Sequence, residues 1–128
     1  MFNSIKRVYF VGIGGIGMSG LARYFHQRGC LVCGYDRTET ELTHSLLAEG
    51  INIIFTDDEN LVPISFQEPD EETLIIYTPA IPAESSILNF FNNQGFELKK
   101  RAEVLGIISE GMFCVAIAGT HGKTTTSS

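Results

Sequence analysis

Short apolar runs of β-forming residues alternate with segments of helical apolar spacing along most of this chain. In the first helical segment, Met18, Leu21, Ala22 and Phe25 recur at i, i+3, i+4 and i+7, which places them on one helix face. Strands that alternate with helices form a parallel sheet, because each crossover returns the chain to the same end of the sheet. We therefore predict an α/β fold, a doubly wound parallel sheet with helices on both faces. Its strands are expected at residues 7–11, 31–35, 51–55, 73–77, 96–99 and 112–118.

Capping residues predict where the helices begin and end. Thr38 and Glu41 have the capping-box spacing, which places the start of the second helix at Thr38. Either Ser85 or Ser86 caps the third helix, and residues 101–109 form a short fourth one. Glycine readily adopts the left-handed backbone that ends a helix. The first three helices are therefore expected to end at Gly29, Gly50 and Gly95.

A glycine-rich loop, residues 12–17, joins the first strand to the first helix with the pattern G-x-G-x-x-G. In this Rossmann-like pattern Gly12 allows a tight turn, Gly14 lets the backbone approach a pyrophosphate, and Gly17 lets helix and strand pack closely. Asp36 closes the second strand, where an acid commonly accepts a ribose hydroxyl. NAD is the default ligand, but any nucleoside diphosphate satisfies the loop. A glycine turn that serves packing alone is the alternative.

A second glycine-rich loop follows the apolar run 112–118. Its backbone N–H groups could cradle ATP phosphates, Lys123 could reach the β- and γ-phosphates, and the Thr124 hydroxyl could bind Mg²⁺. Ile117 stands where the general phosphate-loop pattern has its first glycine, so a shorter variant of that loop is expected. Lys123 and Thr124 are the predicted catalytic residues. The predicted ATP-binding residues are Gly119, Thr120, His121, Gly122, Lys123, Thr124 and Thr125.

Composition excludes several classes of protein. The 128 residues suffice for one ordinary domain, and the formal charge of −6 with scattered cations argues against a nucleic-acid partner. No run reaches the ~20 apolar residues of a membrane span. Cys30 and Cys33 form C-x-x-C on an expected strand, where they point to opposite faces and cannot share a metal. We interpret them as buried thiols, and the odd count with Cys114 favours the cytoplasm.

Other polar residues receive plain structural interpretations. His26 and His44 are expected on helix surfaces, with no acid or cysteine constellation around them. The acids of residues 56–72 are expected to form the solvated face of a loop rather than a general acid/base pair.

The run "AGTHGKTTT" after a Rossmann-like domain resembles the Mur ligase family, the ATP-dependent amide ligases of peptidoglycan precursor synthesis. "VGIGGIGMSGLA", "GYD" and "RAEVLG" extend the resemblance over nearly the whole chain, toward the members that join L-alanine to UDP-N-acetylmuramic acid. The related murein tripeptide ligase is one alternative. An NAD-binding domain of a dehydrogenase or regulatory protein is another, and a nucleotide-sensing module without a catalytic unit is a third.

The resemblance implies three domains, which bind the UDP-sugar, ATP and the amino acid. Residues 1–111 would then form the Rossmann-like UDP-sugar-binding domain, and residues 112–128 the first strand and phosphate loop of a truncated central ATPase domain. The implied partners are UDP-N-acetylmuramic acid, L-alanine and the missing central and C-terminal domains. In the implied reaction ATP phosphorylates the lactyl carboxylate, and the amine of L-alanine displaces phosphate. The chain alone is expected to be inactive.

The resemblance also implies roles for individual residues. The loop from Gly14 to Met18 would hold the UDP pyrophosphate, and Asp36 with Arg37 would contact the uridine. Residues 78–81 match a Ser-Ser-Ala-Ile stretch of the family, with Thr-Pro in place of Ser-Ser, and Arg101 begins its Arg-Ala-Glu motif. The implied UDP-sugar residues are Gly14, Gly15, Ile16, Gly17, Met18, Asp36, Arg37, Thr78, Ala80, Ile81 and Arg101.

Overall fold

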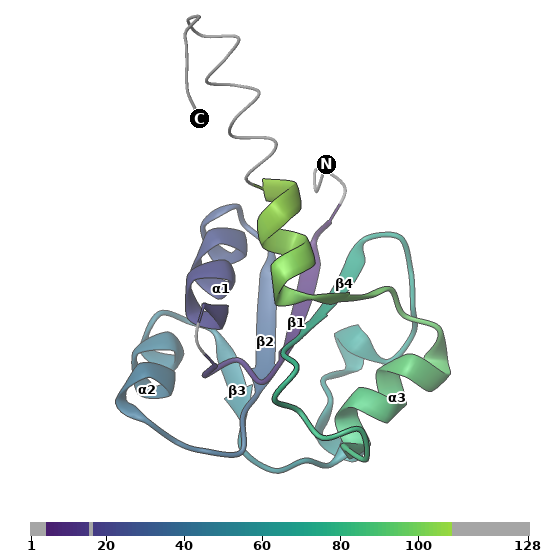
Figure 1. The fold of residues 1–128 in the computed structure, drawn as a ribbon. Helices are drawn as coiled ribbons and strands as arrows, with labels where there is room; N and C mark the ends of the chain where they lie inside the picture. Colours follow the sequence, from purple (N-terminus) through teal and green to yellow (C-terminus); the bar gives the residue numbers. More distant parts are fainter. Residues whose placement is uncertain (1–4, 16, 109–128) are drawn as a thin grey trace, which may run out of the picture.

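A parallel sheet of five strands, in the order β3-β2-β1-β4-β5, runs through the centre of the molecule (Figure 1). The computed structural model describes residues 5–15 and 17–108. The predicted α/β doubly wound fold is confirmed, while the expected strand at 112–118 lies outside the described residues. The strands are β1 (Arg7–Val11), β2 (Leu31–Tyr35), β3 (Asn52–Ile54), β4 (Thr73–Tyr77) and β5 (Leu98–Lys100).

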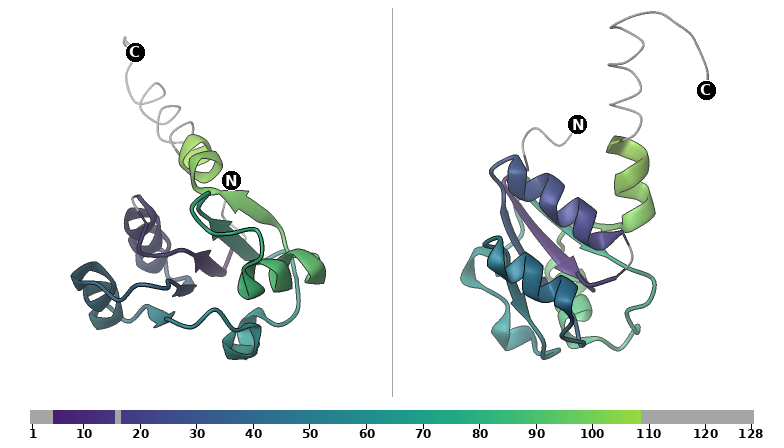
Figure 2. Two further views of the ribbon diagram at one scale, coloured as in Figure 1. Left: turned by 60° about the horizontal axis from the view of Figure 1, so that its bottom comes forward. Right: turned by 90° about the vertical axis from the view of Figure 1, so that its left-hand side faces the viewer.

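Helices cover both faces of the sheet, as the two views of Figure 2 show. One face carries α1 (Met18–Gln27), α2 (Glu41–Ala48) and the helical residues 101–108, and their buried side chains pack against alternate residues of the strands. The other face carries α3 (Ser86–Gln94) and the 3₁₀ turns η1 (Glu59–Leu61) and η2 (Ile64–Phe66).

The central strands are apolar on both faces because both faces are covered. In β1, Val8 and Phe10 belong to the core under α1 and α2, whereas Tyr9 and Val11 belong to the core under α3. Each large apolar side chain that is fully buried contributes about 1.5–3 kcal/mol relative to an exposed one. This two-sided burial explains why β1 and β4 were recognisable as uninterrupted apolar runs.

The three helix-ending glycines were predicted correctly, and the residue after each one explains a shift in strand boundaries. Gly29, Gly50 and Gly95 all have positive φ. The next residue donates its N–H back into the helix, as Ile51 does to the Leu46 carbonyl at 3.1 Å. This bond closes the helix end and keeps an apolar side chain in the core. Ile51 and Phe96 therefore belong to helix termini, and β3 and β5 begin after them.

The predicted start of α2 was wrong by two residues. Thr40, not Thr38, is the N-cap: its hydroxyl accepts the Thr43 N–H at 3.2 Å, and the Thr43 hydroxyl accepts the Thr40 N–H at 2.8 Å. The Thr38 N–H, which the predicted capping box would pair with Glu41, donates instead to the Asp36 carboxylate at 2.9 Å. For α3 the two predicted alternatives are resolved, since Ser85 is the N-cap.

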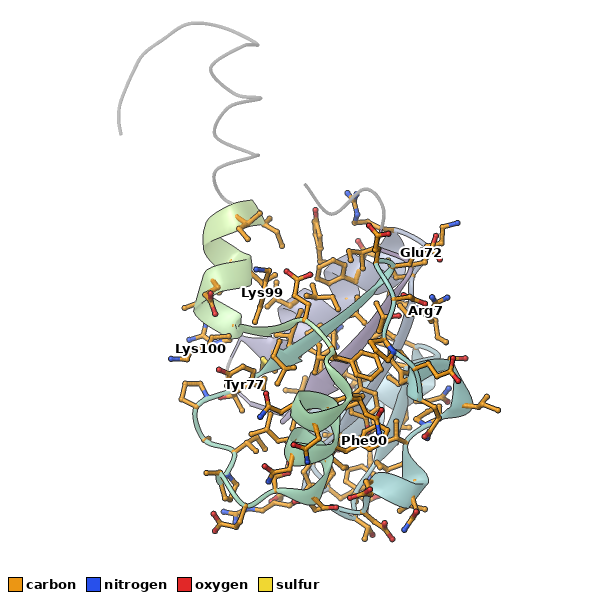
Figure 3. The ribbon with its side chains drawn as sticks, turned by 90° about the vertical axis from the view of Figure 1, so that its right-hand side faces the viewer. Arg7, Glu72, Tyr77, Phe90, Lys99 and Lys100 are labelled. Carbon is orange, nitrogen blue, oxygen red and sulfur yellow. The ribbon has the colours of Figure 1, made fainter. Side chains whose placement is uncertain are left out.

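Charged pairs hold β4 against β1 at the amino-terminal edge of the sheet. Arg7 Nε donates to the Thr73 hydroxyl at 3.0 Å, and its guanidinium also pairs with Asp70 and Glu72. Figure 3 shows Arg7 and Glu72 together near this edge. The opposite edge, where the strands end, is left to glycine-rich and polar loops.

Candidate functional site

A pocket of about 280 Å³ lies at the carboxyl ends of β1, β2 and β4, the lower edge of the sheet in Figure 1. The strand order places β1 between β2 and β4: the chain runs outward from β1 through β2 and β3, then crosses to the other side of β1 to form β4. Ligands of doubly wound sheets bind in the crevice at such a point. The lining residues are Gly12, Gly15, Tyr35, Asp36, Arg37, Thr38, Asp57, Thr78, Ala80, Ile81 and Pro82.

Six of the residues predicted for the UDP-sugar meet in this pocket, although they come from three separate loops. They are Gly15, Asp36, Arg37, Thr78, Ala80 and Ile81.

Gly12 brings the loop after β1 against the loop after β4. Its φ is +94°, and its N–H donates to the Tyr35 carbonyl at 2.7 Å. A Cβ at this position would lie 2.4 Å from the Thr78 Cγ2, closer than any side chain tolerates. The tight turn predicted for Gly12 is present, and glycine is required there for two independent reasons.

Asp36 organises the glycine loop from the end of β2. Its Oδ2 accepts the Gly14 N–H at 2.9 Å, and its Oδ1 accepts the Thr38 N–H at 2.9 Å. Because an ionised carboxylate can accept about four hydrogen bonds, room remains for a ligand hydroxyl. The sequence predicted a ligand contact for Asp36 but not its bond to Gly14, which joins positions 22 residues apart.

Gly17 has a neighbour that the sequence did not predict. It is exposed and has φ +80°, and a Cβ there would lie 2.9 Å from the Arg101 Nη1. Gly17 is also the N-cap of α1, which has no side-chain cap and no acid in its first turn. The Arg101 guanidinium and the partial positive charge of the helix terminus therefore lie together, an arrangement suited to an anion.

Backbone hydrogen bonds fix two more of the predicted residues, Met18 beside the pocket and Ile81 in its lining. The Met18 side chain is fully buried in the core, and its N–H donates to the Gly15 carbonyl at 3.0 Å, so it supports the loop. After β4, the Ile81 N–H donates to the Thr78 carbonyl at 3.1 Å and closes a turn. Pro79 occupies the second position of that turn, which suits its fixed φ.

Several predicted residues lie outside the described part of the chain. They are Ile16 of the first loop and Gly119, Thr120, His121, Gly122, Lys123, Thr124 and Thr125 of the second.

Asp57 is an acidic pocket residue that the sequence analysis did not predict, as it did not predict Tyr35, Thr38 and Pro82. The acids of residues 56–72 were expected to form a solvated face, but Asp57 is half-buried and lines the pocket. Its Oδ1 accepts hydrogen bonds from the Ser85 hydroxyl at 3.0 Å and from the Ile87 N–H at 2.9 Å. Burial, with the charges of Asp57 and Asp36 next in importance, raises the pKa of Tyr35. The sequence could have indicated Asp57 by its position just after β3, because β3 and β2 end at the same edge of the sheet.

The cysteines behave as predicted within the described residues. Cys30 and Cys33 are free thiols that lie in the two separate cores on opposite faces of the sheet. Burial raises the pKa of both thiols, which keeps them protonated and unreactive. Residues 5–15 and 17–108 contain no cluster of three His, Cys, Asp or Glu able to hold a metal ion.

The histidines show one contact that the sequence did not reveal. His44 is exposed, as predicted, but its Nε2 lies 2.6 Å from the Glu39 carboxylate. None of the helices in the described ranges is long and apolar enough to cross a bilayer.

Comparison with known proteins gives the family. The model of the Mur ligase family, described as its catalytic domain, matches residues 7–112. The chain belongs to the Mur ligase family. The matched segment contains both the glycine loop and Arg101, and it ends before the predicted phosphate loop at 119–125.

Curated relatives of this Mur ligase chain include enzymes named UDP-N-acetylmuramate–L-alanine ligase. A UDP-N-acetylmuramate–L-alanine ligase of Porphyromonas gingivalis is 54% identical over 123 residues, covering 96% of this chain and 27% of that protein. The ligase of the same name from Flavobacterium johnsoniae is 55% identical over 126 residues, covering 98% of this chain and 28% of that protein. The chain thus spans about a quarter of the length of these relatives.

Solved structures of Mur ligases share the fold. The UDP-N-acetylmuramate–alanine ligase of Thermotoga maritima matches with a TM-score of 0.71 at 27% identity, covering 81% of this chain and 23% of that one. The UDP-N-acetylmuramate:L-alanyl-γ-D-glutamyl-meso-diaminopimelate ligase from Neisseria meningitides matches with a TM-score of 0.64 at 21% identity, covering 76% and 29% respectively. The second likeness shows the fold alone.

Proposed function

We propose that the described residues form the UDP-N-acetylmuramic acid site of an ATP-dependent ligase that joins L-alanine to this sugar nucleotide. The observation that carries the proposal is the pocket at the carboxyl ends of the strands, lined by residues from the loops after β1, β2 and β4. The relatives that are 54–55% identical carry the name of this activity. The tripeptide ligase reading has weaker support, since the solved tripeptide ligase is 21% identical.

The charges near the pocket favour one orientation of the ligand. The diphosphate would lie against the glycine loop, where the uncapped terminus of α1 and Arg101 supply positive potential. The uridine would lie toward Asp36 and Arg37, which line the pocket. The Asp36 carboxylate would accept a ribose hydroxyl while it holds the Gly14 N–H.

The phosphoryl-transfer part of the proposal concerns residues 119–125. Bound ATP and Mg²⁺ would supply the activated acyl phosphate, with Lys123 and Thr124 as their expected contacts. These residues lie outside the described part of the chain, as does the whole of the proposed ATPase segment 112–128, so the division at residue 111 is also a proposal. L-alanine and further domains are its proposed partners, and the cytoplasm, which suits the free thiols, is its proposed compartment.

A calorimetric titration of the chain with UDP-N-acetylmuramic acid, and with NAD in a parallel run, tests the proposed function. We expect heat of binding from the UDP-sugar and none from NAD, because the pocket is lined by residues matched to the UDP-sugar loops. Binding of NAD alone would overturn the proposal in favour of a dehydrogenase-like domain.

A further inference from the structure

Asp57 enters the pocket with one carboxylate oxygen fixed by α3. Its Oδ1 accepts both the Ser85 hydroxyl and the Ile87 N–H, at 3.0 and 2.9 Å. Within the described residues, Oδ2 has no donor, and the residue lines the pocket. The orientation of the carboxylate is therefore set before any ligand arrives. Oδ2 is the acceptor that Asp57 has left for a ligand.

The strand order gives Asp57 a place along an extended nucleotide. Gly12 follows β1, Asp36 follows β2 and Asp57 follows β3, and these three strands are consecutive neighbours in the sheet. In such folds the phosphates bind after β1 and the ribose binds the acid after β2. A residue after β3 lies one strand further out, beyond the ribose. That is the position of the base.

Charge and size agree with this placement. Among the described lining residues, the carboxylates of Asp36 and Asp57 outnumber the cation Arg37, so this side of the pocket favours hydrogen-bond donors of the ligand. The phosphates would lie on the other side, toward the glycine loop and Arg101. Its volume of about 280 Å³ lies near the lower limit, roughly 300 Å³, of small-molecule sites. This space suits the nucleoside part of a nucleotide sugar, whose donors are the ribose hydroxyls and any ring N–H of the base.

We propose that Asp57 selects the base: its Oδ2 accepts the ring N–H of an imide base such as uracil. This inference rests on the proposed UDP-sugar function and extends it to a specificity-determining residue. Cytosine presents a bare ring nitrogen at the same position, so its lone pair would face the carboxylate. The two acceptors would repel each other, and a buried acceptor left unpaired is costly. The site therefore favours uridine over cytidine nucleotides.

The variant Asp57→Asn tests the proposal with little structural disturbance. The Ile87 N–H can only donate, so the amide oxygen of the new side chain keeps the Oδ1 position and the anchor of α3 is retained. The amide NH₂ then takes the Oδ2 position and presents donors to the base. Asp58→Asn is the matched control, because Asp58 caps η1 through the Asn60 N–H at 2.9 Å and does not line the pocket.

The affinities of the chain and both variants for UDP and CDP are measured by calorimetry. We expect the unmodified chain to bind UDP at least tenfold more tightly than CDP. Asp57→Asn is expected to weaken UDP at least tenfold and to remove or reverse the preference, while Asp58→Asn keeps it. A UDP analogue methylated at the base N3, which lacks the N–H, should bind the unmodified chain at least tenfold more weakly than UDP. This last comparison does not depend on the folding of any variant.

The remaining outcomes separate this inference from the proposed function. Equal affinity for UDP and CDP, or a preference that survives Asp57→Asn, would overturn the role of Asp57 and leave the UDP-sugar site standing. Full affinity for the N3-methylated analogue would do the same. Failure of the unmodified chain to bind UDP, CDP and UDP-N-acetylmuramic acid would overturn both.

Discussion

Two glycines of the same chain segment show how much the environment of a residue decides. Gly12 has φ +94° and a neighbouring side chain 2.4 Å from the place of a Cβ. Gly20 lies within α1, is exposed and has nothing within 4 Å of that place. The sequence pattern marks both as glycines near a nucleotide loop, but only one of them is required by geometry.

Gly12→Ala and Gly20→Ala are therefore expected to change stability in opposite directions. Gly12→Ala should lower the free energy of unfolding by about 1–3 kcal/mol, because alanine is strained at positive φ and its methyl group meets Thr78. Gly20→Ala should raise it by about 0.5–1 kcal/mol, since alanine is the better helix former. Urea unfolding followed by circular dichroism measures both. A Gly12→Ala variant as stable as the unmodified chain would show that the loop adapts without cost.

At the scale of elements, α3 is anchored by its amino-terminal end. Ser85 is 2% exposed, accepts the Leu88 N–H at 3.3 Å and donates to Asp57. Among the described residues, the neighbouring Ser86 makes only long side-chain contacts, with Glu59 at 3.3 and 3.4 Å. The sequence permitted either serine as the cap, because both precede the apolar stripe of the helix. Only the position of Asp57, brought in from the loop after β3, distinguishes them.

Ser85→Ala is expected to lower the free energy of unfolding by about 0.5–2 kcal/mol through loss of the cap. Ser86→Ala serves as the control and should stay within about 0.5 kcal/mol of the unmodified chain. Thermal unfolding of the two variants measures the difference. Equal melting temperatures would mean that the Ser85 hydroxyl does not stabilise α3.

At the scale of the whole molecule, burial of weak acids should make the fold sensitive to alkali. Burial raises the pKa of Cys30, Cys33 and Tyr35, and it raises the pKa of Tyr9 far above its ordinary value of 10.0. The folded chain keeps protons that the unfolded chain releases. The stability from these groups is fully present below the unfolded-state pKa and is lost as pH rises from there toward the folded-state pKa.

The variant Tyr9→Phe removes the buried phenol with the strongly raised pKa, and so tests its share of the alkaline loss of stability. The Tyr9 hydroxyl has no hydrogen-bond partner among the described residues, so its removal should leave stability at pH 7 unchanged or raise it by about 1 kcal/mol. Between pH 9 and 11 the variant should lose less stability than the unmodified chain. Melting temperatures across this range measure the effect. Parallel pH profiles would show that the phenol does not carry the alkaline loss.

Local patterns in the sequence determined most of the elements. The apolar spacing predicted α1, β1, β2 and β4, and three glycines marked where helices end, because these features depend on residues within one or two turns of each other. The pattern G-x-G-x-x-G located the loop after β1 for the same reason. The same pattern pointed to Asp36, and resemblance to the Mur ligases added five more residues that line the pocket, from three separate loops.

Only the tertiary structure decided which distant residues meet. The sheet order β3-β2-β1-β4-β5 brings Thr78 to Gly12, Arg101 to Gly17, and Asp57 to Ser85, at separations that no periodic pattern reports. The same order places Asp57, which the sequence assigned to a solvated loop, in the lining of the pocket. Helices and strands follow from local hydrogen bonds and the apolar face of each segment, whereas a site at the end of a parallel sheet depends on the order in which its strands lie.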